Sequence, residues 1–365
     1  MFNFDNILCF RAFTELYIDV DQKHYRPCCQ FDPHQGILYE GMIDFHKKIR
    51  DDNLKNQWSR GCENCKNAEI NKTLSHRMFS ANLPDQTIIN DNKFILKHLE
   101  LRLDATCNLA CITCDSGSSS KWASEDRRMY GGPIFKNEQL DYNWIYDEKL
   151  WENVESLTLY GGEPFYSKKT KTLLFWLIEK NLSQNIKVTL YTNGSIVNDE
   201  IIKNLENFKS CTIGVSIDGI GENFEIIRWP AKWSEILFNF EKLKSIKNSS
   251  IYITYTVSVL NIFNIQQDYE YLKNNFSNNI SFNFVVNPNY YNIVNLPENF
   301  KVKLINNFEK NPIFSNVIGK LKVKGNSELL KDCVSKLKVL DRFRNTYSFS
   351  LFPEKFANFL IDNHP

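Results

Sequence analysis

Short apolar runs alternate with amphipathic stretches from about residue 98 onward. Between the runs, apolar residues recur at helical spacing, which predicts helices over 168–182, 199–208 and 233–247. The second helix could be capped by either Asn198 or Asp199. The runs themselves are rich in apolar and β-branched residues, as is typical of strands buried on both faces, and they predict strands over 98–104, 156–160, 187–191, 211–217, 251–259 and 280–286.

Six strand-then-helix steps in chain order predict the α/β class and a parallel sheet with right-handed crossovers. The count falls short of the eight units of a closed TIM barrel, so we expect an open, partial (β/α)6 barrel of the TIM type. Ligands of such sheets bind at the carboxyl ends of the strands. We expect three domains: a small cysteine-rich module over 1–95, the barrel core over 96–290, and a C-terminal helical extension over 291–365.

Charge gives no reason to expect a nucleic acid or an anionic membrane as a partner, because Lys and Arg total 44 against 43 Asp and Glu. No apolar run reaches the length of a membrane span, and the start MFNFDNILCFRAF lacks the features of a signal peptide. We therefore expect a cytoplasmic protein. In a reducing compartment its ten cysteines are more plausibly metal ligands than disulfides, and seven or eight of them fall in two groups.

The first cysteine group is a C-x3-C-x2-C loop, Cys107, Cys111 and Cys114, directly after the strand 98–104. Three thiolates can hold three irons of a [4Fe–4S] cluster and leave the fourth iron without a protein ligand, whereas an electron-transfer cluster takes four cysteines. A zinc site would need a further Cys or His nearby, and only Asp115 is a candidate donor in the next forty residues. The spacing therefore predicts a cluster with an open iron, the active centre of a redox enzyme.

Candidate ligand-binding residues follow the ends of the later strands. Gly161 and Gly162 let the backbone approach a ligand closely, and Glu163 could either fix this turn or contact the ligand. Thr192 and Asn193 after the third strand are as compatible with a turn as with ligand contact. The remaining candidates are Pro164 in the same turn, Ser216 and Asp218 at the fourth strand, and Ser258 at the fifth.

The cysteine loop and the GGEP turn at 161–164 together resemble the signature of the radical S-adenosylmethionine (radical SAM) superfamily. The resemblance implies a partial (β/α)6 barrel whose open iron binds the amino and carboxylate groups of SAM. It also implies that the GGEP turn contacts the methionine ammonium and that Ser216 and Asp218 lie near the SAM ribose and carboxylate. Many members carry an aromatic residue where this chain has Thr113, so Trp122 or Tyr160 could take its place beside the adenine.

The second cysteine group precedes the barrel. The segment 9–31 predicts two strands joined by an Asp-containing turn and followed by Pro-Cys-Cys, and a C-x2-C turn comes later. Four thiolates from these turns can hold a fully ligated second cluster or a zinc ion, and their spacing does not separate the two. The order of these features resembles the auxiliary-cluster modules called SPASM and twitch, and its position resembles twitch domain-containing radical SAM proteins. That resemblance implies a second [4Fe–4S] cluster and favours Cys28 over Cys29 in the ligand set Cys9, Cys28, Cys62 and Cys65.

The remaining cysteines and the histidines carry no such pattern. Cys211 and Cys333 lie in apolar stretches and are expected to be buried hydrophobic residues. The six histidines show no HxH or HExxH spacing, and we expect His24, His34 and His46 to be surface polar residues.

The resemblance implies that a one-electron donor such as flavodoxin or ferredoxin reduces the barrel cluster. SAM is then cleaved to methionine and a 5′-deoxyadenosyl radical, which abstracts hydrogen from a substrate carbon. By analogy with auxiliary-cluster families, the expected substrate is a peptide or protein side chain that is oxidised or cross-linked. A small carbohydrate or antibiotic precursor is the alternative small-molecule substrate. A zinc-binding interaction protein on a degenerate radical SAM fold is the alternative that is not an enzyme.

Overall fold

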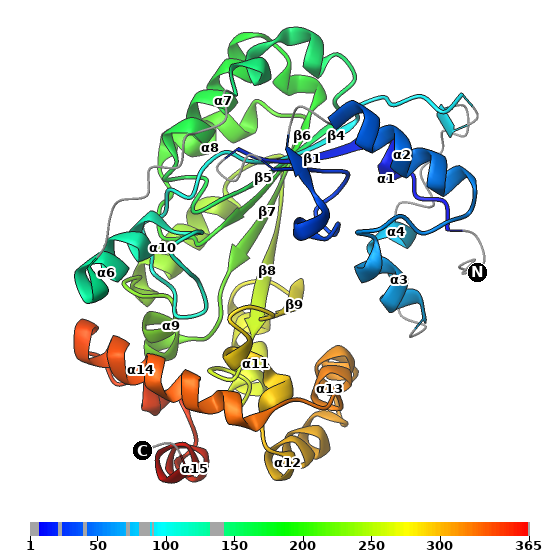
Figure 1. Ribbon diagram of the computed structural model, residues 1–365. Helices are drawn as coiled ribbons and strands as arrows, with labels where there is room; N and C mark the ends of the chain where they lie inside the picture. Colours follow the sequence, from blue (N-terminus) through cyan, green and yellow to red (C-terminus); the bar gives the residue numbers. More distant parts are fainter. Residues whose placement is uncertain are drawn as a thin grey trace. The chain divides into compact units, whose positions relative to one another are not determined.

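The computed structural model describes residues 7–20, 24–38, 42–70, 74–79, 88–89, 91–131 and 142–363 (Figure 1). The chain divides into two compact units. The first comprises Met1–Ala105, Ile134–Leu190 and Lys203–Cys211, and the second comprises Thr106–Pro133, Tyr191–Ile202 and Thr212–Pro365. The predicted domain boundaries at residues 95 and 290 stay predictions.

The strands of the first unit have the hydrogen-bonded order β3-β2-β1-β4-β5-β6. β1 and β2 pair antiparallel, which confirms the predicted N-terminal hairpin, and β3 pairs antiparallel with β2. β1 then pairs parallel with β4, from Glu15 opposite His98 to Asp19 opposite Arg102, so the cysteine-rich segment extends the sheet. The strands are β1 (Glu15–Asp19), β2 (His24–Arg26), β3 (Ile37–Leu38), β4 (His98–Arg102), β5 (Ser156–Tyr160) and β6 (Lys187–Thr192).

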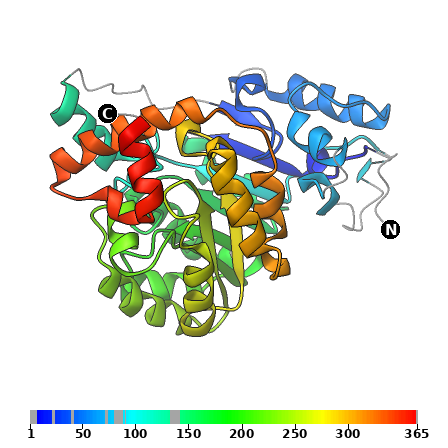
Figure 2. The ribbon, with the colours of Figure 1, turned by 90° about the horizontal axis from the view of Figure 1, so that it is seen from below.

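Helices in the first unit pack a small apolar core around the N-terminal strands. Ala12, Phe13, Phe31 and Ile49 form part of this core, and Cys28 and Cys62 pack against it. Figure 2 shows the blue helices of this segment beside the blue strands. The helices are α1 (Arg11–Thr14), α2 (Met42–Leu54), α3 (Glu63–Ile70), α4 (His76–Phe79) and α7 (Lys168–Glu179).

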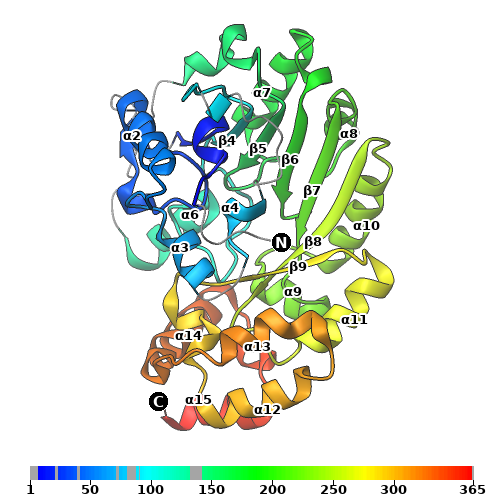
Figure 3. The ribbon, with the colours of Figure 1, turned by 90° about the vertical axis from the view of Figure 1, so that its right-hand side faces the viewer.

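The second unit contains most of β7 (Ser210–Ser216), with β8 (Ser249–Val257) and β9 (Ile280–Phe284), in that hydrogen-bonded order. Figure 3 shows α10 (Trp233–Lys244) alongside β7 and β8. The tail is helical, as predicted. The other helices are α6 (Ser120–Tyr130), α8 (Asp199–Glu206, which spans both units), α9 (Gly221–Ile227), α11 (Ile265–Asn275), α12 (Glu298–Phe308), α13 (Ser315–Leu321), α14 (Leu330–Arg344) and α15 (Glu354–Asn363).

All six predicted barrel strands are present as β4 to β9, with ends that differ from the prediction by at most two residues. Each of these strands except the last is followed by at least one described helix before the next, and neither strand order returns to its first strand. The fold is therefore of the α/β class with an open, partial barrel, which confirms the prediction. Among the described residues, no helix has the length and apolar character needed to cross a membrane.

Two local features differ from, or refine, the sequence-based expectation. Asn198 is the residue that caps α8, because its side-chain oxygen accepts a hydrogen bond from Ile201 N at 2.9 Å. The expectation that His46 is a surface residue is wrong. It is buried between the rings of Tyr25 and Phe94, and burial, reinforced by Arg50, lowers the pKa of its imidazole to about 3.

Candidate functional site

The cysteine loop is fixed first by its own backbone and by the start of α6. Cys107 N donates to Ser120 Oγ at 3.1 Å, and that hydroxyl donates back to Cys107 O at 3.1 Å. Cys114 N donates to Cys111 O at 2.9 Å. Ser119 caps α6 and also donates to Leu109 O at 2.5 Å. The loop conformation is thus set by short-range hydrogen bonds of backbone and serine groups.

Two further backbone bonds and one side-chain bond hold the middle of the loop from the outside. Ala110 N donates to Trp229 O at 2.7 Å, and Ile112 N donates to Ile227 O at 2.8 Å, so the loop pairs with the chain after α9. Trp122 Nε1 donates to Cys111 O at 2.6 Å. The Trp122 ring is 1 % exposed, which makes it part of the loop's packing.

A buried ion pair lies beside the second cysteine. Arg228 donates to Asp218 Oδ2 through Nε at 2.9 Å and Nη2 at 2.8 Å, and its Nη1 lies 4.0 Å from Cys111 Sγ. Asp218 Oδ1 accepts a hydrogen bond from Thr256 N at 2.7 Å. The predicted site residue Asp218 therefore holds a guanidinium next to a cysteine sulfur. A fixed cation at this position favours a thiolate and an anionic metal cluster.

Burial opposes ionisation of these thiols when no metal is bound. It raises the pKa of the Cys111 thiol, although Arg228 acts in the opposite direction. It raises the pKa of Cys114 to about 12, with a further contribution from Cys111. Because metal ligation requires thiolates, binding at this loop must release protons, and the nearby guanidinium lowers the cost of that release.

A polar ring supports the first cysteine. Asn193 Nδ2 donates to Asn108 Oδ1 at 3.0 Å, Asn108 Nδ2 donates to Ser195 Oγ at 2.8 Å, and Ser195 Oγ donates to Asn193 Oδ1 at 2.6 Å. The same Asn193 amide lies 3.9 Å from Cys107 Sγ. The structure thus brings the predicted residue Asn193 to the cysteine loop. Thr192 is 1 % exposed and accepts a hydrogen bond from Gly194 N, as a turn residue does.

Ser216 and Ser258 differ in their access to a ligand. Ser216 is half-buried and its hydroxyl accepts a hydrogen bond from Thr254 at 3.1 Å. Ser258 is fully buried, and its hydroxyl bonds within its own turn to Asn261 and to Leu260 N. The structure does not open Ser258 to a ligand, whereas Ser216 retains partial exposure.

The GGEP turn belongs to the first unit and is closely packed. Gly161 has φ of +146°, and a Cβ atom there would lie 2.8 Å from Asp104 O, so only glycine fits. Glu163 is fully buried and accepts a hydrogen bond from Phe165 N at 3.1 Å. Of the two roles considered for Glu163, the structure shows the one that fixes the turn. Pro164 is buried behind it, while Gly161 is exposed.

The N-terminal cysteines also gather at one place. Cys9, Cys28, Cys62 and Cys65 line a cavity of about 30 Å³ in the first unit, and Cys29 is not among its lining residues. Burial and the neighbouring sulfur of Cys65 raise the pKa of Cys9 to about 11. Four sulfur donors around one small cavity have the chemistry of a four-cysteine cluster or a zinc site.

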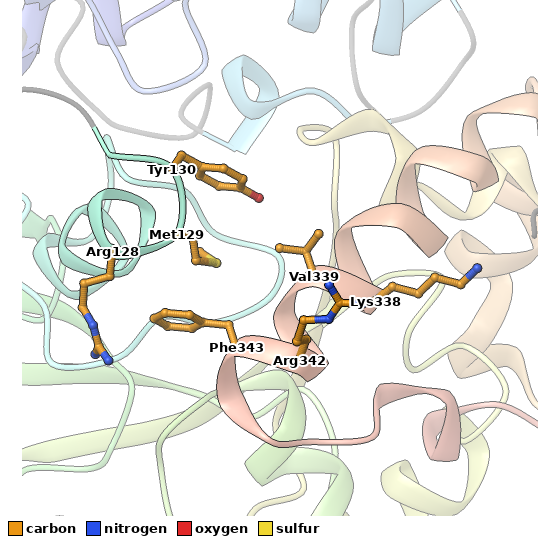
Figure 4. Close-up of a pocket in the computed structure, with 7 residues that line it drawn as sticks. All are labelled: Arg128, Met129, Tyr130, Lys338, Val339, Arg342 and Phe343. Carbon is orange, nitrogen blue, oxygen red and sulfur yellow. The ribbon is translucent and has the colours of Figure 1, made fainter.

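A larger cavity of about 560 Å³ lies between α6 and α14 (Figure 4). Tyr130, Met129 and Phe343 point toward one another there, and Arg128 stacks on the Phe343 ring with its guanidinium carbon 4.9 Å from the ring centroid. The cavity is at the C-terminal end of α6, whereas the cysteine loop is bonded to its first residue. Since α6 has eleven residues, the two are separated by about 15 Å along the helix, so this cavity is not part of the cysteine site.

Sequence reasoning missed several residues that shape these sites. Arg228, Arg344 and Glu125 support the cysteine loop, and no spacing in the sequence identifies them as partners. Glu15 and Glu100 do carry a signal in the sequence, because each is a charged residue inside a strand most of whose residues are buried. A buried charge in a strand is rare without a partner or a ligand.

Comparison with known proteins gives the class of this segment. Residues 105–272 match the family model described as "Radical SAM superfamily". An "AdoMet-dependent heme synthase" of Methanosarcina barkeri (strain Fusaro / DSM 804) is 27% identical over 175 residues, 47% of this chain and 45% of the relative. The chain thus spans about half the length of the curated relative that it matches.

Similar solved structures were also found. "Native anSMEcpe with bound AdoMet and Cp18Cys peptide" has 18% identity and a TM-score of 0.44, covering 61% of each chain. "Streptococcus suis SuiB bound to S-adenosylmethionine" has 13% identity and a TM-score of 0.43, covering 75% of this chain and 60% of that one. The match to the family model begins two residues before Cys107 and contains the complete cysteine loop and the GGEP turn.

The buried pair of Arg344 and Glu125 yields a test of how the loop is held. Arg344 Nη2 donates to Ala110 O at 2.8 Å and to Glu125 Oε2 at 2.7 Å, and both side chains are almost fully buried. Replacing Arg344 with Met leaves the Glu125 charge buried without its ion-pair partner. We expect the free energy of unfolding to fall by about 3–5 kcal/mol and the loop to retain less iron, as measured by urea unfolding and iron analysis.

The matched control is Arg342→Met, which removes an exposed arginine from the same helix. Adding Glu125→Gln to Arg344→Met should recover part of the loss, because it removes the uncompensated charge. Equal urea midpoints for Arg344→Met and Arg342→Met would contradict this account of the loop.

Proposed function

We propose that this protein is a radical SAM enzyme and that Cys107, Cys111 and Cys114 hold its [4Fe–4S] cluster. The observation that carries the proposal is the joint placement of three cysteines on one loop, with a buried guanidinium 4.0 Å from Cys111 Sγ, inside the segment that matches the Radical SAM model. Three sulfur donors fit a cluster with one open iron. A closed zinc site would require a fourth donor.

When bound, the cluster and SAM supply a 5′-deoxyadenosyl radical that removes hydrogen from a substrate carbon. The chain's own residues would hold and orient these groups. The three thiolates ligate iron, Arg228 balances their charge, and the Asn193–Asn108–Ser195 ring keeps the first cysteine in place. We include the exposed Gly161, the half-buried Gly162 and the half-buried Ser216 among the proposed SAM contacts, in keeping with the resemblance.

The buried members of the predicted SAM site would act indirectly. Glu163 and Pro164 fix the turn that presents the two glycines, and Asp218 positions Arg228. Thr192 shapes the turn before Asn193, and Ser258 stabilises the turn after β8. In this proposal the residues that reach SAM are few, and the others give those residues a fixed geometry.

We further propose that Cys9, Cys28, Cys62 and Cys65 hold an auxiliary [4Fe–4S] cluster and that residues 1–95 form a twitch-like module ahead of the barrel and the helical extension. The shared cavity of these four cysteines supports this ligand set over one that contains Cys29. Zinc at this site is the competing occupant, since four thiolates bind either.

The proposed substrate is a peptide or protein side chain, which the enzyme oxidises or cross-links after an external one-electron donor has reduced the barrel cluster. The support is the likeness of the cysteine-rich module to auxiliary-cluster families. A small carbohydrate or antibiotic precursor is the second choice. Incubation with deuterated candidates under anaerobic conditions separates them, because only the true substrate transfers label into 5′-deoxyadenosine.

Single Ala substitutions of Cys107, Cys111 and Cys114 test the proposed active centre. Each should abolish the reductive formation of 5′-deoxyadenosine from SAM, because a cluster with two cysteine ligands lacks the geometry that leaves one iron open. Chromatography of the product measures this directly. Cys211→Ala and Cys333→Ala, which alter buried cysteines outside both groups, are the controls. Undiminished SAM cleavage in the loop variants would refute the ligand assignment, and zinc without iron in the wild type would reject the enzyme.

Iron content tests the auxiliary cluster. The reconstituted protein should contain about eight iron atoms and eight sulfides per chain, and Cys62→Ala/Cys65→Ala should contain about four. Because the two ligand sets share no residue, this variant should keep some SAM cleavage. Cys29→Ala is the matched control and should keep about eight iron atoms. A wild type with about four iron atoms and one zinc bound by four sulfurs would show that the N-terminal cysteines hold zinc instead.

A further inference from the structure

Outside both cysteine sets, one group of potential ligands converges in the first unit. A carboxylate oxygen of Glu15, the sulfur of Cys29 and a ring nitrogen of His76 all lie within 4.8 Å of one another. They come from β1, from the turn after β2 and from α4. Cys29, the N-terminal cysteine outside the proposed auxiliary-cluster ligands, therefore belongs to a separate group of donors that combines sulfur, nitrogen and oxygen.

The spacing of these donors matches a tetrahedral metal ion. His76 Nε2 lies 3.6 Å from Cys29 Sγ. Zinc–sulfur bonds of about 2.3 Å and zinc–nitrogen bonds of about 2.0–2.1 Å, meeting at a tetrahedral angle, place the two ligand atoms about 3.6 Å apart. No backbone movement is needed for these two residues to share one ion.

Glu15 carries an independent sign of a missing partner. Its side chain is 1 % exposed, and one oxygen forms an ion pair with Arg11, whereas the buried Oε1 has no hydrogen-bond partner. Glu100 approaches the same region, since its Oε2 accepts a hydrogen bond from Cys29 N at 3.0 Å. In a metal-bound state with Glu15, Glu100 and Cys29 all ionised, three negative charges would face the guanidinium of Arg11, and a divalent cation would balance them.

The ligands are also held in position by a shell of other residues. Ser75 and Arg77, on either side of His76, both donate to the buried carboxylate of Glu69 in α3, at 2.5 to 2.9 Å. Cys29 is held by its bond to Glu100, which in turn accepts a hydrogen bond from Tyr160 at 3.4 Å. Supporting contacts of this kind are what a metal site needs to fix its ligands.

We propose that Glu15, Cys29 and His76 bind one zinc ion, at a site separate from the auxiliary cluster. Sulfur, imidazole and carboxylate together suit zinc, and three protein ligands leave a fourth position open. Cys29 and His76 are half-buried, so this position is accessible to water or to a donor group of a substrate. The proposal does not rest on the proposed enzymatic function.

The test uses the full-length protein with its clusters reconstituted, incubated with zinc sulfate and freed of unbound metal by gel filtration. Zinc and iron are then counted, and zinc X-ray absorption identifies the ligands. We expect about one zinc per chain with one sulfur and three nitrogen or oxygen neighbours. Cys29→Ser and His76→Gln should lose at least nine-tenths of the zinc and keep their iron. His34→Gln, which changes an exposed histidine of the same segment, should keep both.

Three results would overturn the proposal: a wild type that retains no zinc, zinc retained by both Cys29→Ser and His76→Gln, or a zinc shell with four sulfurs. The last would instead place zinc at Cys9, Cys28, Cys62 and Cys65. If a variant also loses iron, the number of sulfur neighbours around zinc in the wild type still distinguishes the two sites, because the proposed site gives one sulfur and the four-cysteine site gives four. A Cys107→Ala protein is expected to lose SAM cleavage. Zinc retained by that protein would support the zinc site independently of the enzymatic activity.

Discussion

A buried positive charge beside a cysteine sulfur is the constraint on which the candidate active centre depends. Arg228 lies 4.0 Å from Cys111 Sγ and forms an ion pair with Asp218, whose carboxylate accepts a hydrogen bond from Thr256 N. Asp218 follows β7, Thr256 lies in β8, and Arg228 follows α9, so one ion pair connects three elements to the loop. A cysteine-ligated cluster carries negative charge into a buried region, and a fixed cation reduces the desolvation cost of doing so.

Buried charged residues recur beside the segments that carry the proposed metal ligands. The loop carbonyl of Ala110 is held by Arg344, which is neutralised by Glu125. In the first unit, Arg77, the residue after His76, forms a buried ion pair with Glu69. In each case a buried ion pair fixes a short segment that carries a potential ligand. Ion pairs of this kind add little net stability compared with apolar packing, so their value here lies in holding one geometry.

More of the fold than of the candidate sites could be predicted from the sequence. The strands β4 to β9 were predictable because each is a short run rich in apolar and β-branched residues, although the burial differs among them: β7 is mostly buried, whereas β9 has no fully buried residue. Helix α11 was not, because its buried face includes Asp268, whose carboxylate accepts a hydrogen bond from Tyr255 at 2.6 Å. A polar residue on the buried stripe breaks the periodicity on which such a prediction relies.

The cysteines could be recognised because ligand spacing on one loop is a local property. Arg228 could not be assigned to Asp218, since they are ten positions apart and the helix between them brings them together only in the folded chain. The parallel pairing of β1 with β4 was equally hidden, because it joins segments about eighty residues apart. Glu15 and Glu100 were visible as charges within buried strands, but their convergence on Cys29 and His76 depends on that same pairing.

The central claim is that one iron of the cluster at Cys107, Cys111 and Cys114 has no protein ligand and binds SAM. Electron paramagnetic resonance of the reduced Cys62→Ala/Cys65→Ala protein, with and without SAM, tests it most directly because only the barrel cluster then contributes to the signal. The account predicts that SAM changes the g-values of the reduced cluster. A spectrum that stays the same at saturating SAM would contradict it.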